Sequence, residues 1–393
     1  MDLIRVMPAE AKLSKAPSEW SYDAVVVGGG VIGLSCAWRL AQRGARVAVV
    51  ERALPPTGAT SVAAGMLAPV GELAFGEPEL LKLTLAAARA YPAFVAELEE
   101  ASGRSTGYQR RGALHIALDR DEAAELRRVH ELQRSLGLGA EWLPPRRCRE
   151  LEPGLTPSFN GGVHAPDEAM VDPHELTEAL LVALARESVE VMTGTEAVAA
   201  LMDGDRVRGV RTDAIAHIAH GPAVARTGVA GELPADNVVL ATGAWSGQAK
   251  WLPEAARPPV RPVKGQILEL RARDGAPPCE RILCSERVYL VPRPDGRLIV
   301  GATVEEQGFD TAVTAGGVHE LLREAYRLLP DVAEMELVEA TASLRPGTPD
   351  NLPLTGPSPV EGLVWATGHY RNGILLAPLA AEAIATELMG VAA

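Results

Sequence analysis

The chain has 393 residues, of which 47% are hydrophobic, and it contains 38 glycines and 30 prolines. This length and composition are typical of a globular protein with two domains and many turns. The formal net charge of −13 argues against nucleic acid as a partner, because lysine and arginine are dispersed and form no basic stripe. No run of 18 apolar residues occurs, which argues against a membrane-spanning helix and a membrane partner.

The first 20 residues lack the apolar core of a signal peptide. They predict a flexible N-terminal extension on a cytoplasmic protein.

A glycine-rich turn follows this extension. Residues 23–27 are apolar, residues 28–33 read Gly-Gly-Gly-Val-Ile-Gly, residues 34–43 have a helical pattern, and the apolar run 46–50 ends at Glu51. Strand, G-x-G-x-x-G, helix, strand and acidic residue together predict a dinucleotide site. The glycines permit close contact with a pyrophosphate at the helix N-terminus, and the acidic side chain can accept from a ribose hydroxyl. NAD and FAD satisfy this motif equally well.

Small residues at 57–61 and 63–69 predict a segment that lies flat against a large planar ligand. Further along, His164 and His174 flank Asp172-Pro173. A metal site is one interpretation, but the pattern favours Asp172 as the N-cap of a helix over residues 175–186.

The cysteines and the missing hydrolase motifs exclude several classes of site. Cys36, Cys148, Cys279 and Cys284 form no C-x-x-C pair and have no histidine at zinc-ligand spacing, so reduced thiols and no metal are expected. Covalent attachment of a flavin to Cys284 is a remote alternative. Neither G-x-S-x-G nor H-E-x-x-H is present, and hydrolase activity therefore has no motif.

The region from residue 237 onward contains two kinds of pattern, strands that end in glycine turns and a β-hairpin. The apolar run 237–240 ends in Ala-Thr-Gly, as does the run 363–365 with its following residues, so three strand-to-glycine turns are expected to converge on one cofactor. Between them, residues 289–293 and 297–303 flank Pro-Asp-Gly, which predicts a β-hairpin. An antiparallel sheet inserted into a dinucleotide fold implies a second domain that covers the reactive end of the cofactor.

The segment 366–378 predicts a ligand site of its own. It leads from an apolar strand through a glycine-rich turn into a helical stretch, and Arg371 lies at the helix N-terminus, where a cation is disfavoured. A nearby anion would relieve that conflict. An exposed arginine on a surface turn is the alternative.

These patterns resemble the glycine oxidase branch of the D-amino acid oxidase family. The matching segments span nearly the whole chain after residue 20 and comprise residues 28–33 with Glu51, 63–67, 262–265, 289–293, 300–303, 344–348 and 368–378. The resemblance implies an α/β fold in which a Rossmann-type FAD-binding domain interleaves with an α+β substrate domain built on a large mixed or antiparallel sheet. We expect the FAD-binding domain to comprise residues 21–90, 150–255 and 336–393, and the substrate domain residues 91–149 and 256–335.

The resemblance and the glycine turns also assign site residues. Non-covalent FAD is expected to contact Gly28, Gly30, Val31, Ile32, Gly33, Glu51, Arg52, Ala59, Thr60, Ser61, Ala64, Gly65, Met66, Ala197, Gly243, His369, Tyr370, Arg371, Asn372, Gly373, Ile374 and Leu375. The substrate is expected to contact Arg345, Arg371 and Tyr289. A guanidinium fork suits a carboxylate because it binds both oxygens, and Arg345, fixed before Pro346, is the preferred fork. Tyr289 could instead be a packed strand aromatic.

The implied activity is oxidative deamination of glycine and other small amines or D-amino acids such as sarcosine, D-alanine and D-proline. If the amine is neutral, hydride transfer to flavin N5 requires positioning and no acid or base from the protein. Dioxygen would be reduced to hydrogen peroxide, and a 2-oxo acid would leave with ammonia or an amine. The family implies a link to thiamine (thiazole) biosynthesis and suits a homotetramer.

Two alternatives to an oxidase remain open. One is a dehydrogenase that passes electrons to another acceptor, and the other is a non-catalytic FAD-binding protein. Arg287, where related chains have a different polar residue, leaves the preferred substrate open.

Overall fold

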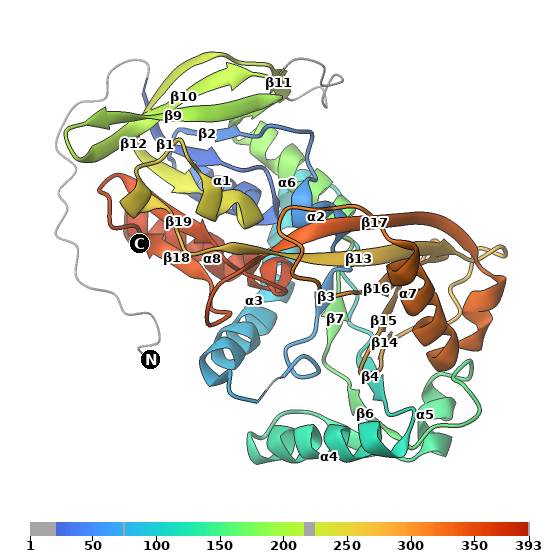
Figure 1. The fold of residues 1–393 in the computed structure, drawn as a ribbon. Coiled ribbons are helices and arrows are strands. Elements are labelled where there is room, and N and C mark those ends of the chain that lie inside the picture. The colour runs from blue at the N-terminus through green and yellow to red at the C-terminus, as the bar shows by residue number, and fades with distance from the viewer. Residues whose placement is uncertain (1–20, 74, 216–224, 392–393) are drawn as a thin grey trace.

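The computed structural model describes residues 21–73, 75–215 and 225–391. The predicted N-terminal extension lies outside the described residues. Two large sheets dominate the fold, with most helices packed beside the first sheet and between the two (Figure 1). The predicted α/β class, with a dinucleotide-type sheet and a separate mixed sheet, is confirmed.

The first sheet has nine strands and is built around a parallel centre. Its main path runs β11-β8-β2-β1-β12-β10-β9, with β19 also paired to β12 and β18 to β19. Neighbouring parallel strands such as β1 and β2 are continuous apolar runs because helices cover one face and further strands the other. The strands are β1 (Tyr22–Val27), β2 (Val47–Val50), β8 (Glu190–Thr193), β9 (Thr195–Asp203), β10 (Arg206–Ala214), β11 (Ala225–Thr227), β12 (Gly231–Leu240), β18 (Leu354–Pro357) and β19 (Leu363–Thr367).

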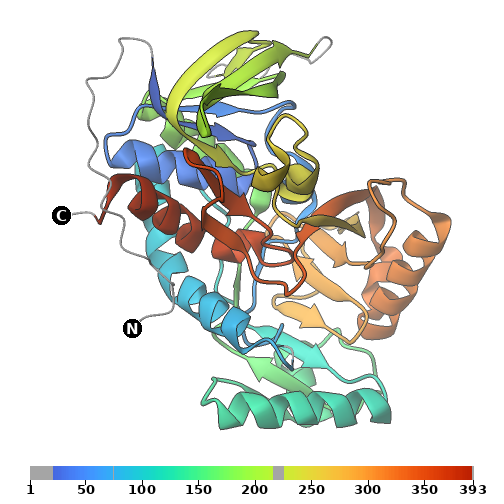
Figure 2. The same ribbon diagram turned by 60° about the vertical axis from the view of Figure 1, so that its left-hand side comes forward.

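Alternate residues of β1 enter two different cores. Ala24 and Val26 pack into a cluster with four helices, whereas Val25 and Val27 pack against residues of β9, β10 and β12. Figure 2 shows the helices side by side on one face of the sheet. They are α1 (Val31–Gln42), α3 (Pro78–Ser102), α6 (Pro173–Arg186) and α8 (Gly373–Met389).

The second sheet has eight strands in the order β17-β13-β16-β15-β14-β4-β6-β5. Most neighbours are antiparallel, but β14 and β4 are parallel, so the sheet is mixed. The predicted hairpin is confirmed, because β15 pairs antiparallel with β16. The strands are β4 (Ala113–Ile116), β5 (Glu141–Leu143), β6 (Gly162–Ala165), β13 (Arg261–Arg271), β14 (Ile282–Cys284), β15 (Tyr289–Pro292), β16 (Arg297–Gly301) and β17 (Glu336–Gly347).

Shorter elements complete the described part of the chain. Strands β3 (Met66–Leu67) and β7 (Ala169–Met170) form a small ladder between the two large sheets. The remaining helices are α2 (Gly58–Val62), α4 (Arg120–Ser135), α5 (Pro145–Leu151), α7 (Ala315–Leu328) and the 3₁₀ turns η1 (Gly243–Gln248), η2 (Glu254–Ala256) and η3 (Pro330–Glu334).

Two strands depart from the predicted domain limits. Strands β6 and β17 lie within segments predicted for the FAD-binding domain, yet both hydrogen-bond into the second sheet. Strand β17 pairs along β13 from Arg261↔Gly347 to Arg271↔Glu336. Such pairing joins residues about 75 positions apart in the sequence, and no local pattern reveals it.

Asp172 joins helix α6 to the second sheet. Its Oδ1 accepts from the backbone N–H groups of His174 (2.9 Å) and Glu175 (3.4 Å), so the N-cap interpretation is confirmed. Its Oδ2 lies 2.7 Å from an Arg297 nitrogen and 3.4 Å from Arg293 Nε. Within the described ranges, no group of three or more His, Cys, Asp or Glu side chains could hold a metal ion.

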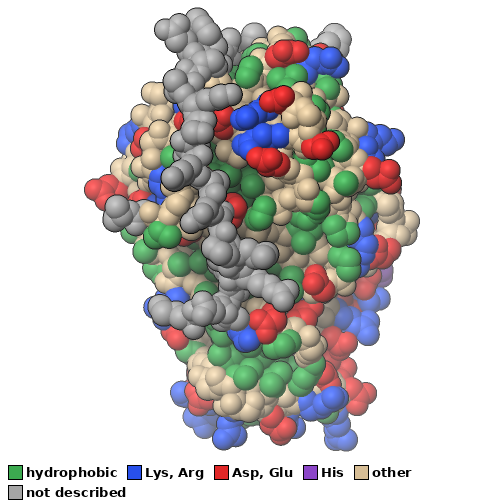
Figure 3. All heavy atoms as spheres, turned by 90° about the vertical axis from the view of Figure 1, so that its left-hand side faces the viewer, with side chains coloured by type: hydrophobic (Ala, Val, Ile, Leu, Met, Phe, Trp, Pro, Cys, Tyr) green, Lys and Arg blue, Asp and Glu red, His purple; other side chains and the backbone are tan. Residues whose placement is uncertain are grey.

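The surface carries charges of both signs. Acidic and basic side chains are interspersed over the face in Figure 3. Among the described helices, none is both long and apolar enough to cross a membrane.

We expect Asp172→Ala to lower the free energy of unfolding by about 3–5 kcal/mol, because it leaves two guanidinium groups without their buried partner. Asp172→Asn should cost less, since an amide oxygen can still cap α6. Urea unfolding followed by tryptophan fluorescence measures both. Equal losses for the two variants would contradict a contribution of the cap, since Asp172→Asn loses the ion pair but keeps the cap acceptor.

The same carboxylate predicts a pH dependence. Burial raises the pKa of Asp172, but Arg293 and Arg297 outweigh it and hold the pKa below its ordinary value of 3.8. The contribution of Asp172 to stability is therefore complete above the unfolded pKa and lost as the pH falls through the folded pKa. Stability measured against pH should fall less steeply in this acidic range for Asp172→Ala than for the unaltered protein.

Candidate functional site

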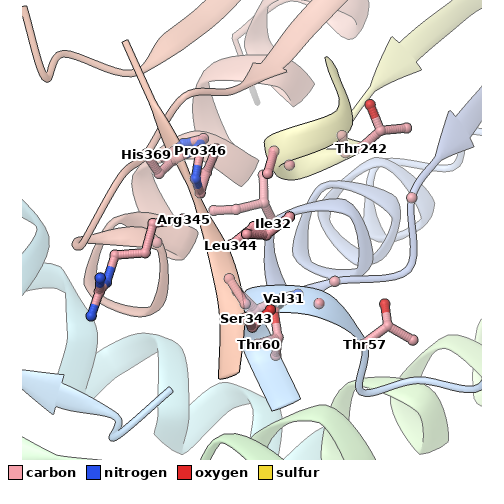
Figure 4. A pocket seen from close by; sticks show the side chains of 18 of the residues that line it. Val31, Ile32, Thr57, Thr60, Thr242, Ser343, Leu344, Arg345, Pro346 and His369 are labelled. Atoms are coloured by element: carbon pink, nitrogen blue, oxygen red, sulfur yellow. Dashed lines mark hydrogen bonds between the residues drawn. The ribbon is translucent and has the colours of Figure 1, made fainter. Parts of the chain in front are cut away.

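A cavity of about 430 Å³ opens between the two sheets. The three predicted strand-to-glycine turns, at residues 27–32, 241–245 and 366–371, all contribute to its wall, as expected. In the view of Figure 4, Arg345 and His369 lie at the opposite end from Thr57 and Thr242. The cavity thus extends from Arg345 and His369 at one end to Thr57 and Thr242 at the other.

The first glycine turn is held in shape by Glu51. Glu51 Oε2 accepts from Gly29 N (2.6 Å) and Oε1 from Ala53 N (2.9 Å), while the Thr60 hydroxyl accepts from Val31 N (3.1 Å). A side chain at Gly28 would put its Cβ 2.3 Å from the Ala241 oxygen, at a φ of +117°. The turn therefore requires glycine at this position.

Two long helices begin at the cavity without a cap. Helix α1 starts after Gly30 and α8 after Asn372, and neither has a side-chain cap or an acidic residue in its first turn. The N-terminal residues of both helices line the cavity. Their N–H groups and the positive ends of their dipoles favour an anionic ligand such as a pyrophosphate or a reduced flavin.

The C-terminal turn combines one buried and one exposed side chain. His369 is 2% exposed, and burial lowers its pKa to about 4, so its imidazole is neutral at physiological pH. Arg371 is exposed at the rim, with its guanidinium carbon 5.4 Å from the centre of the Tyr370 ring. Tyr370 N donates to the Pro346 oxygen (3.0 Å), which ties this turn to β17.

Arg345 and Tyr289 lie together on the second sheet. Arg345 Nη1 donates to the backbone oxygens of Thr303 (3.1 Å) and Lys264 (3.3 Å). Burial raises the pKa of Tyr289 to about 12, and the neighbouring Arg345 partly offsets that rise. A Cβ at Gly265 would lie 2.4 Å from Arg345 Nη2, and one at Gly301 would lie 2.4 Å from Tyr289 Oη. These glycines make the room in which the two side chains lie.

Most predicted site residues line this one cavity. The exceptions are Gly33, Ser61, Asn372 and Leu375, of which Ser61 lines a smaller neighbouring pocket. Several lining residues were missed by the sequence predictions, among them Glu72, Trp245 and Gly265. Gly265 stands in a segment that carried the family resemblance, and Trp245 follows the second Ala-Thr-Gly turn, but no pattern marks Glu72.

Arg287, singled out in the sequence, is exposed and does not line the cavity. Cys284 is buried, and burial raises the pKa of its thiol well above the usual value, so the nucleophilic thiolate is disfavoured.

The family model for FAD-dependent oxidoreductases, DAO, matches residues 23–387. The chain belongs to this family. The cavity fits FAD, because a glycine turn that leaves no room for a Cβ and two uncapped helix N-termini meet in one elongated space.

Glycine oxidases are among the most similar members of the family. The chain is 36% identical to glycine oxidase from Geobacillus kaustophilus over 91% of this chain and 90% of the relative. The crystal structure of glycine oxidase from that organism superposes with a TM-score of 0.83, 33% identity and coverage of 95% and 96% of the two chains.

A second group of relatives is longer than this chain. The chain is 37% identical to the bifunctional protein ThiO/ThiG of Trichormus variabilis, over 92% of this chain but 52% of the relative. It thus spans about half the length of these bifunctional relatives.

For FAD binding, we expect Glu51→Ala to weaken affinity by about 10- to 100-fold, because it removes the acceptor of two backbone N–H groups that shape the glycine turn. Glu51→Gln should weaken affinity less, since its amide oxygen can replace one acceptor. Titration of the apoprotein with FAD, followed by flavin fluorescence, gives both affinities. Unchanged affinity in Glu51→Ala would show that the turn holds its shape without this side chain.

Proposed function

We propose that the protein is an FAD-dependent oxidase of glycine and other small amines or D-amino acids. The observation that carries this proposal is the placement of Arg345 and Tyr289 in the same cavity as the dinucleotide turn. An amino acid held there by its carboxylate would meet the cofactor directly. The glycine oxidases among the relatives support the same activity.

Each part of the site has a proposed role. The turn residues and the N-termini of α1 and α8 hold FAD, which when bound supplies the hydride acceptor and the means of reducing dioxygen. Arg345 grips the substrate carboxylate with its guanidinium fork, and the Tyr289 hydroxyl donates to one carboxylate oxygen. Arg371 lies at the rim and contributes positive charge to the same end of the cavity.

The protein supplies positioning instead of acid–base chemistry in this proposal. His369 is neutral and buried, so it suits a contact with the cofactor and not a cationic acid. Orientation of the α C–H bond and the positive helix ends carry the catalysis. The products are hydrogen peroxide, a 2-oxo acid and ammonia or an amine.

The proposal extends to the metabolic role of the protein. The bifunctional ThiO/ThiG relatives support a link to thiazole formation in thiamine biosynthesis. A cytoplasmic location and a homotetramer stay predictions.

A peroxide-coupled screen of glycine, sarcosine, D-alanine and D-proline tests the activity. We expect turnover with at least one of these amines and, in Arg345→Ala, a loss of kcat/KM of about 100-fold or more, because a charged bidentate contact is removed. Undiminished turnover in this variant would contradict the assignment of Arg345 to the substrate carboxylate. Dye reduction without oxygen consumption would favour a dehydrogenase, and a flavin that stays oxidised after anaerobic addition of every amine would favour a non-catalytic protein.

Gly265→Ala should act on the same contact without touching the arginine. The new methyl group would displace the Arg345 guanidinium, so we expect the KM for the amine substrate to rise about tenfold or more while FAD content stays unchanged. Gly316→Ala is the matched control, because a Cβ at that position meets no atom within 4 Å. Steady-state kinetics of both variants give the comparison, and equal KM values would contradict the steric role of Gly265.

A further inference from the structure

Glu72 is a carboxylate of the cavity wall that has no partner within the described part of the chain. Its side chain lines the cavity together with Tyr289 and Arg345, and its backbone N–H donates to the Ala68 oxygen (3.0 Å). Across residues 21–73, 75–215 and 225–391, its carboxylate makes neither a hydrogen bond nor an ion pair. Glu72 is half-buried, and a carboxylate that is partly withdrawn from water is costly unless it is paired. Glu72 therefore has its full capacity to accept hydrogen bonds available to a ligand.

Other withdrawn carboxylates in this protein are engaged. Glu51 accepts from the backbone at Gly29, and Glu152 accepts from the backbone at Arg281. Both serve the fold by satisfying N–H groups of the chain. Glu51 also lines the cavity, but Glu72 differs from both because its carboxylate satisfies no N–H group within the described part of the chain.

The charges around Glu72 have the pattern that a zwitterion requires. Burial is the largest influence on its pKa and raises it, while the positive charges of Arg371 and Arg345 act in the opposite direction. The carboxylate thus shares one space with the two arginines proposed to hold a substrate carboxylate. An amino acid brings an anionic and a cationic group, and this end of the cavity offers a partner for each.

The backbone that carries Glu72 is fixed from behind. Glu168, which is 1% exposed, accepts from the N–H groups of Val70 (3.1 Å) and Gly71, and Gln133 Nε2 donates to the Val70 oxygen (2.9 Å). A Cβ at Gly71 would lie 2.0 Å from His115 Nε2, so the segment packs closely against β4. Glu72 therefore projects from a backbone whose position is set by two buried side chains, Glu168 from the turn between β6 and β7 and Gln133 from α4.

We propose that Glu72 binds the amino group of the substrate and penalises substrates that bear a second carboxylate. This inference rests on the proposed function. With Arg345 on the carboxylate and Glu72 on the amine, two charged contacts fix the orientation of a small amino acid. A diacid would bring its second carboxylate toward Glu72, where like charges repel.

Kinetics of the Glu72→Gln holoenzyme test this proposal. We expect kcat/KM for glycine to fall about 10- to 100-fold, while the dissociation constant of acetate, which lacks the amine, stays the same or falls. Acetate binding is read from the flavin absorbance. The ratio of kcat/KM for iminodiacetate to that for glycine should rise about tenfold or more. Equal weakening of glycine and acetate, or an unchanged diacid ratio, would overturn the proposal.

Two further variants separate recognition from folding. Glu72→Asp keeps the charge, so it should retain more of the preference for glycine over iminodiacetate than Glu72→Gln does. Glu79→Gln is the matched control, because Glu79 is an exposed carboxylate of α3 that pairs with Lys82 (2.7 Å). It should match the unaltered enzyme in both substrates. The FAD content of every variant shows whether the fold is intact.

One ligand distinguishes failure of this inference from failure of the proposed function. 2-Aminoisobutyrate has no α hydrogen to lose, so its binding can be followed in the flavin spectrum without turnover, and isobutyrate is the same acid without the amine. If the unaltered protein oxidises no amine, the proposed function fails. A preference for 2-aminoisobutyrate over isobutyrate that Glu72→Gln abolishes would still support amine recognition, and a preference that it leaves unchanged would overturn it.

Discussion

The contact between Arg293 and the Asp172 region is the constraint on which the rest of the site depends. Arg293 is 4% exposed, comes from the second sheet, and donates to the Ala64 oxygen in the small-residue segment that lines the cavity. Its charge is tolerated in the interior because Asp172, at the start of α6, lies beside it. One guanidinium therefore connects the second sheet, the start of α6 and the small-residue segment of the cavity wall.

The electrostatics of the cavity follow from where the helices begin. Helices α1 and α8 both bring uncapped N-termini to its wall, and the arginines add positive charge. Glu51 is the acidic residue of the dinucleotide fingerprint, but its oxygens already hold two backbone N–H groups of the protein. The excess of positive charge along the cavity wall suits a cofactor that carries a pyrophosphate and gains negative charge on reduction, as FAD does.

The sequence predicted the parts of the site that depend on local chain geometry. The glycine turn before α1, the Asp172 cap and the hairpin of β15 and β16 each need only neighbouring residues, and each is confirmed. The pairing of β17 with β13 could not be predicted in this way, because it depends on contacts distant in sequence. Glu72 was missed for a related reason. Its role depends on Glu168 and Gln133, which reach its segment from other elements.

Sheet register explains how the second sheet presents Tyr289 and Arg345, the side chains that we propose bind the substrate. Tyr289 lies directly opposite Gly301 in the β15–β16 pair, so its ring crosses a position that has no side chain. Arg345 pairs with Val263, and its guanidinium lies over Gly265, two residues along the facing strand. Direct and diagonal neighbours of this kind are the pairs that contact each other on one face of a sheet. A register slip of one residue would turn either side chain to the opposite face. The hydrogen-bonded ladder of the second sheet therefore positions both side chains, and the glycines on the facing strands are as much a part of the site as the tyrosine and arginine themselves.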